Sequence, residues 1–261
     1  MSNAPSPQAV LPTLDKLRAA IPVDLEPSIV AAKWFESFST HLEAGHVDAV
    51  VQLFVDDSFW RDILALTWDF RTFRGQPRIH RFLTDRLASA GVSSLKLRPE
   101  SVGLFKLYPD LAWIQGLFDF ETNIGIVSGI FRLVPTESGE WKAHSIFTNL
   151  EDLKNFPEKI GALRNHKPNH GEWVKQRYDE GQFDGKDPVV LICGGGQSGL
   201  GLAARLKCLD VPTLVVEKNE RIGDNWRNRY EALCLHDPVC TFRFAFSMQY
   251  CTLTLRTNCR V

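Results

Sequence analysis

The 261-residue sequence predicts two parts of different fold class, an α+β domain followed by an incomplete α/β segment. In the first part, helical patterns precede runs in which hydrophobic and polar residues alternate, an order typical of helices packed on an antiparallel sheet. In the second part, a short apolar run leads into closely spaced glycines and a helical pattern, which is typical of a parallel strand–helix–strand unit. We therefore expect a flexible N-terminus over 1–26, an α+β domain over 27–150, a linker over 151–187, a partial βαβ segment over 188–239 and an atypical tail over 240–261.

The composition is that of an ordinary globular protein. Lys and Arg nearly balance Asp and Glu, giving a net charge of −1, so no basic surface for nucleic acid or membranes is indicated. No apolar run is long enough to span a membrane, and the polar, proline-containing start lacks the pattern of a signal peptide. The six cysteines lack the spacing of metal sites or disulfide frameworks. We therefore expect a cytoplasmic protein without a metal site.

Three helices are expected in the α+β domain. The first begins near Ser28, ends at Gly45 and has one apolar face, formed by Ala31, Trp34, Phe35, Phe38 and Leu42. Asp48 is expected to cap a second, short helix. The third has Pro77 in its first turn, ends at Gly91 and has an apolar face formed by Ile79, Phe82, Leu83 and Leu87.

Strands are expected where β-favouring residues run between turn signals. One precedes the third helix, and the others follow it as an antiparallel meander: 58–66, then 94–98, 102–107, 111–121, 124–134 and 141–150. This order of elements, together with the stretch DDSFWRDILALTWDFRTFRG, resembles the NTF2-like, or SnoaL-like, cone, in which a curved sheet wraps around three helices. The resemblance implies a pocket at the open end of the cone and a homodimer formed through this domain.

Asp62 and His144 are candidates for catalysis in this domain, because acids act as bases in some proteins with the cone. Strand alternation places Asp62 on the same face as Trp60 and opposite to Arg61. Alternatively, both polar residues pair with neighbouring groups or water while a set of indoles fills a core: Trp60, Trp68, Trp113 and Trp141. We favour this structural interpretation, because a fold alone does not specify a function.

Residues 151–187 have the composition of a solvated connector, with one short helix expected over 172–178. His166 and His170 are four residues apart, but Pro168 lies between them and disfavours a helix that would present both to a metal. We interpret them as surface histidines.

A glycine motif organises the second part. Gly194, Gly196 and Gly199 have the spacing G-x-G-x-x-G directly after the apolar run 189–193, and a helical pattern follows. Gly194 would allow a tight turn, Gly196 a close approach of the backbone to a pyrophosphate, and Gly199 close packing of the helix on the strand. The N-terminus of the helix would offer free N–H groups and a positive dipole end to the phosphates.

A second apolar run, 211–216, ends at Glu217, whose carboxylate would accept hydrogen bonds from a ribose. An acid at this position favours FAD or NAD over NADP. Cys193 and Cys208, which flank the helical pattern, are expected to be small buried residues.

The residues that follow Glu217 resemble the flavin-dependent monooxygenases, the group of flavin-containing and Baeyer–Villiger-type enzymes. In that family a Gly-x-x-Trp element follows the ribose-binding acid and lines the flavin. Here Gly223, Asp224, Asn225 and Trp226 match that element, and Arg227 continues it. Together with the first part, this gives the expected fold: an α+β NTF2-like cone followed by an incomplete α/β Rossmann-type FAD-binding segment.

The resemblance implies a flavoprotein oxidoreductase that uses FAD and NADPH for hydroxylation or Baeyer–Villiger oxidation of a small organic molecule. It implies no catalytic acid, base or nucleophile in this chain. The residues that it implies for cofactor binding are Gly194, Gly195, Gly196, Gln197, Ser198, Gly199, Glu217, Lys218, Gly223, Asp224, Asn225, Trp226 and Arg227.

The resemblance stops at Val239, and the family's second glycine motif for NADPH and its substrate domain do not follow. We therefore expect either a C-terminally truncated form or a sequence read past a splice or frame error, and in both cases the NADPH site is absent from this chain. From Cys240 onward the sequence has no acid, glycine or proline, and its apolar residues alternate, which is also the pattern of a half-buried strand: Phe242, Phe244, Phe246, Met248 and Tyr250.

Three functions stay open at this point. The leading one is an FAD-binding, NADPH-dependent monooxygenase family member in shortened form. The alternative is a non-catalytic NTF2-like module for ligand binding or dimerisation, with a vestigial dinucleotide-binding segment. The third, an NAD-linked reductase that uses the same glycine loop, is disfavoured by Trp226.

Overall fold

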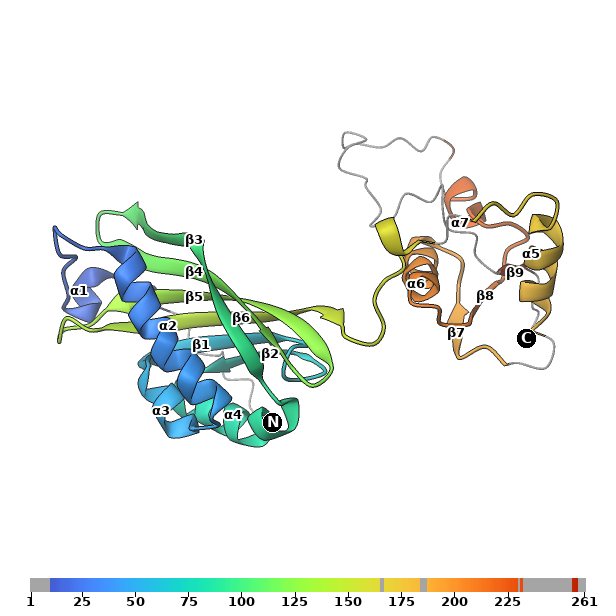
Figure 1. The fold of residues 1–261 in the computed structure, drawn as a ribbon. Helices are drawn as coiled ribbons and strands as arrows, with labels where there is room; N and C mark the ends of the chain where they lie inside the picture. The colour runs from blue at the N-terminus through green and yellow to red at the C-terminus, as the bar shows by residue number, and fades with distance from the viewer. Residues whose placement is uncertain (1–9, 165–166, 184–186, 230, 232–254, 258–261) are drawn as a thin grey trace, which may run out of the picture. The chain divides into compact units, whose positions relative to one another are not determined.

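The structure, a computed structural model, describes residues 10–164, 167–183, 187–229, 231 and 255–257. The chain divides into two compact units, unit 1 (Met1–Asn155) and unit 2 (Phe156–Val261). Each unit has its own cluster of buried hydrophobic residues. In Figure 1 the colours of unit 1 run from blue to yellow-green, and those of unit 2 from yellow to red.

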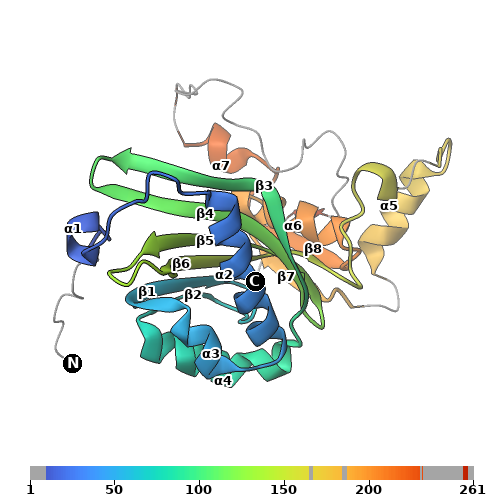
Figure 2. The same cartoon turned by 60° about the vertical axis from the view of Figure 1, so that its left-hand side comes forward.

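Unit 1 is an α+β domain in which helices lie against one face of a curved sheet (Figures 1 and 2). Its helices are α1 (Leu14–Leu17), α2 (Pro27–Glu43), α3 (Val47–Gln52) and α4 (Gln76–Ala90). Its strands are β1 (Phe54–Ile63), β2 (Phe70–Arg74), β3 (Ser93–Tyr108), β4 (Leu111–Glu121), β5 (Gly125–Pro135) and β6 (Trp141–Leu153).

The six strands form one mixed sheet in the order β2-β1-β6-β5-β4-β3. The meander from β3 to β6 is antiparallel, as the sequence predicts. Strand β1 joins this meander by pairing with β6 in parallel, with Trp60 opposite Ile146 and Asp62 opposite Thr148. Helix α2 packs across β3, β4 and β6, and α4 packs on β1 and β2.

The expected helix boundaries are largely confirmed. Pro27 and Pro77 lie in the first turns of α2 and α4, where a missing N–H costs nothing. Gly91 caps α4 in the left-handed conformation, with φ of 60°. The prediction for Asp48 is wrong: His46 is the N-cap residue of α3, and Asp48 lies in its first turn, where a negative charge still complements the helix dipole.

Two strand predictions also need correction. The expected strands 94–98 and 102–107 are parts of β3, whose pairing with β4 shifts register between Arg98 and Gly103. The expected strand 58–66 is too long at its C-terminal end, because β1 stops at Ile63 and Leu64 has a positive φ of 59°. The chain then turns back as β2, which pairs with β1 in an antiparallel hairpin.

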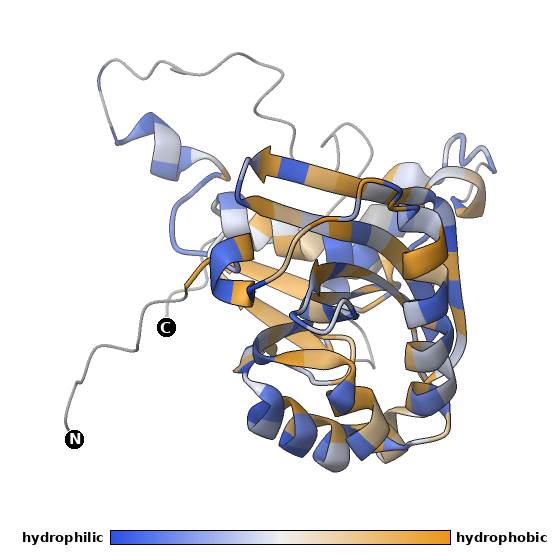
Figure 3. Ribbon diagram, turned by 90° about the vertical axis from the view of Figure 1, so that its left-hand side faces the viewer, coloured by the Kyte–Doolittle hydropathy of each residue, from blue (hydrophilic) through white to orange (hydrophobic). Residues whose placement is uncertain are grey.

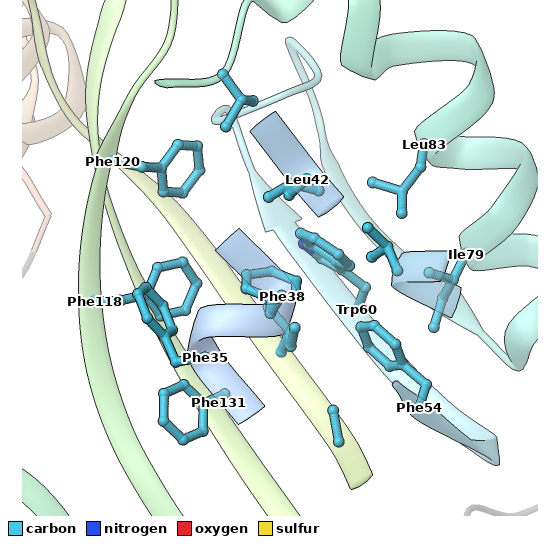
Figure 4. Close-up of a cluster of buried hydrophobic side chains, with 14 of the residues drawn as sticks. Phe35, Phe38, Leu42, Phe54, Trp60, Ile79, Leu83, Phe118, Phe120 and Phe131 are labelled. Carbon is cyan, nitrogen blue, oxygen red and sulfur yellow. The ribbon is translucent and has the colours of Figure 1, made fainter. Parts of the chain in front are cut away.

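Aromatic side chains fill the space between the helices and the sheet of unit 1. Phe38 of α2 lies with its ring centroid 4.9 Å from that of Trp34, 6.0 Å from that of Trp60 and 5.8 Å from that of Phe118. Figure 4 shows the rings of Phe38, Trp60, Phe118 and Phe131 converging from the helix and the strands, together with Ile79 and Leu83 of α4. Figure 3 shows hydrophobic residues along the strands, with hydrophilic and hydrophobic residues alternating along the helices.

Unit 2 contains a parallel strand–helix–strand arrangement. Strand β7 (Val190–Cys193) leads into helix α6 (Gln197–Cys208), which returns to β8 (Thr213–Glu217). Strands β7 and β8 pair in parallel, and β9 (Leu255–Thr257) pairs in parallel on the other side of β8. A short helix, α7 (Asp224–Arg227), follows β8. The alternating residues 242–250 of the tail lie outside the described residues.

Part of the region that we expected to be a connector is attached to unit 2. The N–H of Lys159 donates to the carbonyl oxygen of Cys208 over 2.8 Å, and Lys159 and Glu158 form ion pairs with Asp210 and Arg205. A one-turn 3₁₀ helix, η1 (Gly161–Leu163), and helix α5 (Trp173–Gln182) follow, the latter being longer than the expected 172–178. Within the described part of the chain, no helix combines the length and the apolar character needed to cross a membrane.

Candidate functional site

The glycine loop of unit 2 joins β7 to α6. Gly194, the first glycine, has a φ of 111°, a conformation that residues with a side chain rarely adopt. Its N–H donates to the carbonyl oxygen of Val216 on β8 over 2.8 Å. The first residue of the loop is therefore still hydrogen-bonded to the neighbouring strand. The expectation of a tight turn at Gly194 is confirmed.

Gly199 lies in the first turn of α6, where the helix passes close to the loop. A Cβ atom at this position would overlap the carbonyl oxygen of Gly194 and would lie 3.3 Å from Cγ2 of Ile192 on β7. Only a residue without a side chain therefore allows this approach. The expected close packing of the helix on the strand is confirmed.

Gly196 is the N-cap residue of α6, with φ of −80° and ψ of −173°, and it has no side chain that could cap the helix. The first turn of a helix leaves N–H groups without acceptors inside the helix, and here Gln197 and Ser198 are exposed in that turn. Among the described residues, a Cβ at Gly196 would find only Nδ2 of Asn225, 3.4 Å away. The backbone at Gly196 is therefore open to a neighbour that approaches the helix N-terminus.

Glu217 lies at the C-terminal end of β8 and is buried, with 8% of its surface exposed. Its Oε2 accepts a 2.6 Å hydrogen bond from the N–H of Gly195, and its Oε1 accepts bonds from the N–H and side-chain amide of Asn219. The N–H groups of Asn219 and Gly195 hold the pKa of the Glu217 carboxyl below its ordinary value of 4.5. The carboxylate is therefore charged at neutral pH and ties the end of β8 to the glycine loop.

The segment after β8 returns to the glycine loop. Ile222 lies where a Cβ of Gly195 would be, and the Asn225 side chain lies beside Gly196. Asp224 is buried, accepts a 2.7 Å hydrogen bond from Arg227 and a 3.0 Å bond from the N–H of Arg221. The Arg227 guanidinium holds the pKa of the Asp224 carboxyl below its ordinary value, so this pair is ionic and fixes the α7 turn.

The structure thus brings part of the expected set together. Glu217 and Asn225 contact the glycine loop. The side chain of Lys218 is exposed, and its backbone N–H helps to lower the pKa of the Glu217 carboxyl. Trp226 is 39% exposed and lies beneath the guanidinium of Arg229. Asn219 and Ile222 contact the site and were not predicted. Asn219 could have been found, because Asn near the end of a strand often bonds to the adjacent turn.

The two polar candidates of unit 1 do not form a catalytic pair. Asp62 is fully buried, and its oxygens accept bonds from the N–H groups of Leu66 and Thr67 and from the hydroxyls of Thr67 and Thr148. His144 packs instead against Phe59, and burial lowers the pKa of its imidazole. The structural interpretation of Asp62 is confirmed.

Two expectations about burial are wrong. Trp60 is fully buried and Trp113 and Trp141 are partly buried, but Trp68 is 69% exposed on the loop between β1 and β2. Cys193 is exposed at the end of β7, and Cys208 is half-buried. His170 is exposed, His166 lies outside the described residues, and no three potential metal ligands come together in the part of the chain that the structure describes.

Comparison with known proteins gives short matches to oxidoreductases. The chain is 45% identical over 49 residues to an uncharacterized oxidoreductase, CzcO-like, from Geobacillus kaustophilus, a match that covers 19% of this chain and 14% of that protein. It is 42% identical over 52 residues to the indole-3-pyruvate monooxygenase YUCCA1 of Oryza sativa subsp. japonica, covering 20% and 13%. The matches therefore span only a small part of these relatives, and no protein-family model matches the chain.

Among solved structures, an NTF2-like protein with a cystatin-like fold from Novosphingobium aromaticivorans is similar to this chain. The two are 16% identical, and the match covers 48% of this chain and 82% of the other with a TM-score of 0.37. The description of unit 1 as an α+β domain rests on its own helices and mixed sheet.

Proposed function

We propose that the chain binds FAD through the glycine loop of unit 2 and is a relative of the FAD- and NADPH-dependent monooxygenases. The observation that carries the proposal is the backbone of this loop: Gly194 turns, Gly199 lets α6 approach β7, and Gly196 is left without a bulky neighbour at the helix N-terminus. The local sequence matches to an oxidoreductase and to a plant monooxygenase support the same class.

The residues present fit a dinucleotide. Uncapped N–H groups at the start of a helix bind phosphate oxygens, and a pyrophosphate needs a backbone that it can approach without a Cβ in the way. Glu217 lies at the C-terminal end of β8 beside the glycine loop, where its charged carboxylate would accept a hydrogen bond from a ribose hydroxyl. A charged Glu217 would also repel a 2′-phosphate, which favours FAD.

In this proposal the protein binds and orients the cofactor. When bound and reduced by NADPH, FAD would supply the oxygen chemistry of hydroxylation or Baeyer–Villiger oxidation. Gly196, Gln197 and Ser198 would hold the diphosphate, Glu217 the ribose, and the α7 segment with Trp226 would lie near the flavin. No described residue is assigned as an acid, a base or a nucleophile, and the substrate would be a small organic molecule.

The test compares two alanine variants of neighbouring glycines. Gly196→Ala adds a methyl group that the protein tolerates, because φ and ψ suit any residue and the nearest atom is 3.4 Å away. If a diphosphate lies against this backbone, the variant should weaken FAD binding by about tenfold or more, measured by flavin fluorescence titration of the full chain. Gly201→Ala, five residues along the same segment, has nothing within 4 Å and should leave the affinity unchanged.

Circular dichroism of both variants shows whether the fold is kept. Equal FAD affinity in the wild type and in Gly196→Ala, or tighter binding of NADH than of FAD, would count against the proposal. Oxidation of NADPH in the presence of FAD then separates an active oxidoreductase from a protein that only binds the cofactor.

A second function is favoured by a specific feature of unit 1, a pocket beside α2. In this alternative, unit 1 is an NTF2-like module that binds a small ligand or forms a homodimer, and the nucleotide segment has no catalytic role. Sedimentation of the full chain at several concentrations tests the homodimer, and a monomer at all of them would rule it out.

A further inference from the structure

A pocket of about 640 Å³ lies in unit 1 between the N-terminal half of α2, the end of α3 and the turn that joins β5 to β6. A volume of this size lies within the range of small-molecule sites. The pocket borders the group of aromatic rings around Phe38, which fills the space between α2 and the sheet, and Trp34 belongs to both. It contains none of the residues proposed for FAD.

The apolar walls of the pocket are fixed before any ligand arrives. Trp34 is held by a 3.2 Å hydrogen bond from its indole N–H to the carbonyl oxygen of Leu53 and by stacking on Phe38. Val30 precedes Trp34 by one helical turn on the same face of α2, and Trp141 is held in register by the pairing of β6 with β5. Trp141 is partly buried and Trp34 is 5% exposed, so Trp141, Val30 and the exposed part of Trp34 form apolar walls suited to a flat, apolar ring.

Two lysines and one glutamate are among the residues that line the pocket. Lys33 follows Val30 by three residues on α2, which places the two side chains next to each other on the helix surface. Lys142 is the residue after Trp141 on β6. Among the residues that the structure describes, Lys33 has no salt bridge, and Lys142 has only a 4.0 Å contact with Glu140, which is mostly exposed. Two ammonium groups against one carboxylate give the residues that line the pocket a net positive charge.

From this combination we infer that unit 1 binds a small aromatic carboxylate, with its ring against Trp34 and Trp141 and its carboxylate at Lys33 and Lys142. Carboxylates bound by ammonium groups form charge-assisted hydrogen bonds, which are stronger than neutral ones. The inference rests on the ligand-binding alternative for unit 1 and is independent of FAD binding by unit 2. It specifies the ligand class and the residues that recognise each of its parts.

The test uses two probes of the same shape, 2-naphthoate and uncharged 2-naphthamide, titrated into the full chain by calorimetry. Naphthoate should bind more tightly than naphthamide by about tenfold. Lys33→Gln and Lys142→Gln should each remove much of this difference while leaving naphthamide binding unchanged, and Trp141→Ala should weaken both probes. Lys106→Gln, which changes an exposed lysine of β3 outside the pocket, is the matched control.

Glu140→Gln provides a change of opposite sign. Removing the carboxylate that lies near Lys142 should strengthen naphthoate binding by about twofold to fivefold, an effect that damage to the fold would not produce. Equal affinity for the two probes, no binding of either, or lysine variants that bind naphthoate like the wild type would overturn the inference. FAD titration of the same lysine variants separates this site from unit 2, since their FAD affinity should equal that of the wild type.

Discussion

At the scale of single residues, Asp62 shows how unit 1 accommodates a buried carboxyl group. Two backbone N–H groups and the hydroxyls of Thr67 and Thr148 donate to its carboxylate, and the indole of Trp60 donates to Thr148 over 3.1 Å. These bonds close the loop after β1 and link it to β6. The carboxylate therefore determines where the strand ends, and its acceptor positions are used by the protein itself.

Asp62→Asn should destabilise unit 1 by about 2–4 kcal/mol, because an amide keeps one acceptor oxygen and directs an NH₂ group at donors that need an acceptor. The measurement is urea unfolding of the full chain followed by circular dichroism. Asp56→Asn on the same strand is the control, since Asp56 is exposed, and it should change the free energy of unfolding by less than about 0.5 kcal/mol. Equal stability of the two variants would show that the bonds of Asp62 contribute little.

Sequence reasoning identified the orientation of Asp62 but not its partners. Alternation along a strand separates Arg61 from Trp60 and Asp62, and the structure confirms this. The bond from Thr148 could not be foreseen, because it depends on the parallel pairing of β1 with a strand more than eighty residues away. The burial of Trp68 was predicted wrongly for a related reason. Trp68 lies on the loop between β1 and β2, and the path of that loop decides whether its indole is buried.

At the scale of elements, prediction succeeded where a pattern is local. Strand β4 was predicted at its observed bounds, and α2 and α4 begin and end within about a residue of the expected positions, because proline and glycine mark their ends. Prediction failed where tertiary bonds end a strand, as at Ile63, and where a bulge lies within one, as in β3. In unit 2, the glycine spacing specified the close contact between α6 and β7 because only glycine permits it.

That contact makes α6 sensitive to a single methyl group. Gly199→Ala should destabilise unit 2 by about 1–3 kcal/mol, because the new Cβ overlaps the Gly194 carbonyl oxygen and the helix must move away from β7. Gly201→Ala in the same helix should instead stabilise unit 2 by up to about 1 kcal/mol, because it raises helix propensity in open space. Both are measured by thermal unfolding of the full chain. Destabilisation of similar size in both variants would mean that the helix tolerates neither methyl group and that close packing at Gly199 is not the cause.

At the scale of the whole molecule, the two units differ in the core that supports them. In unit 1, helices α2, α3 and α4 and most of the strands contribute large side chains to one buried cluster. Among the described residues of unit 2, the buried cluster consists of Ile192, Ala203 and Val215. Since hydrophobic stabilisation scales with the apolar area buried, unit 2 is expected to be the less stable unit and to depend more on a bound ligand.

Thermal unfolding of the full chain should therefore show two transitions, of which FAD raises only the lower. At a free FAD concentration 100 times the Kd, a ligand that binds the folded state alone adds about 2.7 kcal/mol to the unit that holds it. The two substitutions above assign the transitions, because Asp62→Asn should lower the upper one and Gly199→Ala the lower one. If FAD instead raised the transition that Asp62→Asn lowers, the cofactor would bind through unit 1. A single transition moved by both substitutions would show that the units unfold together, because neither would then have a stability of its own for the cofactor to change.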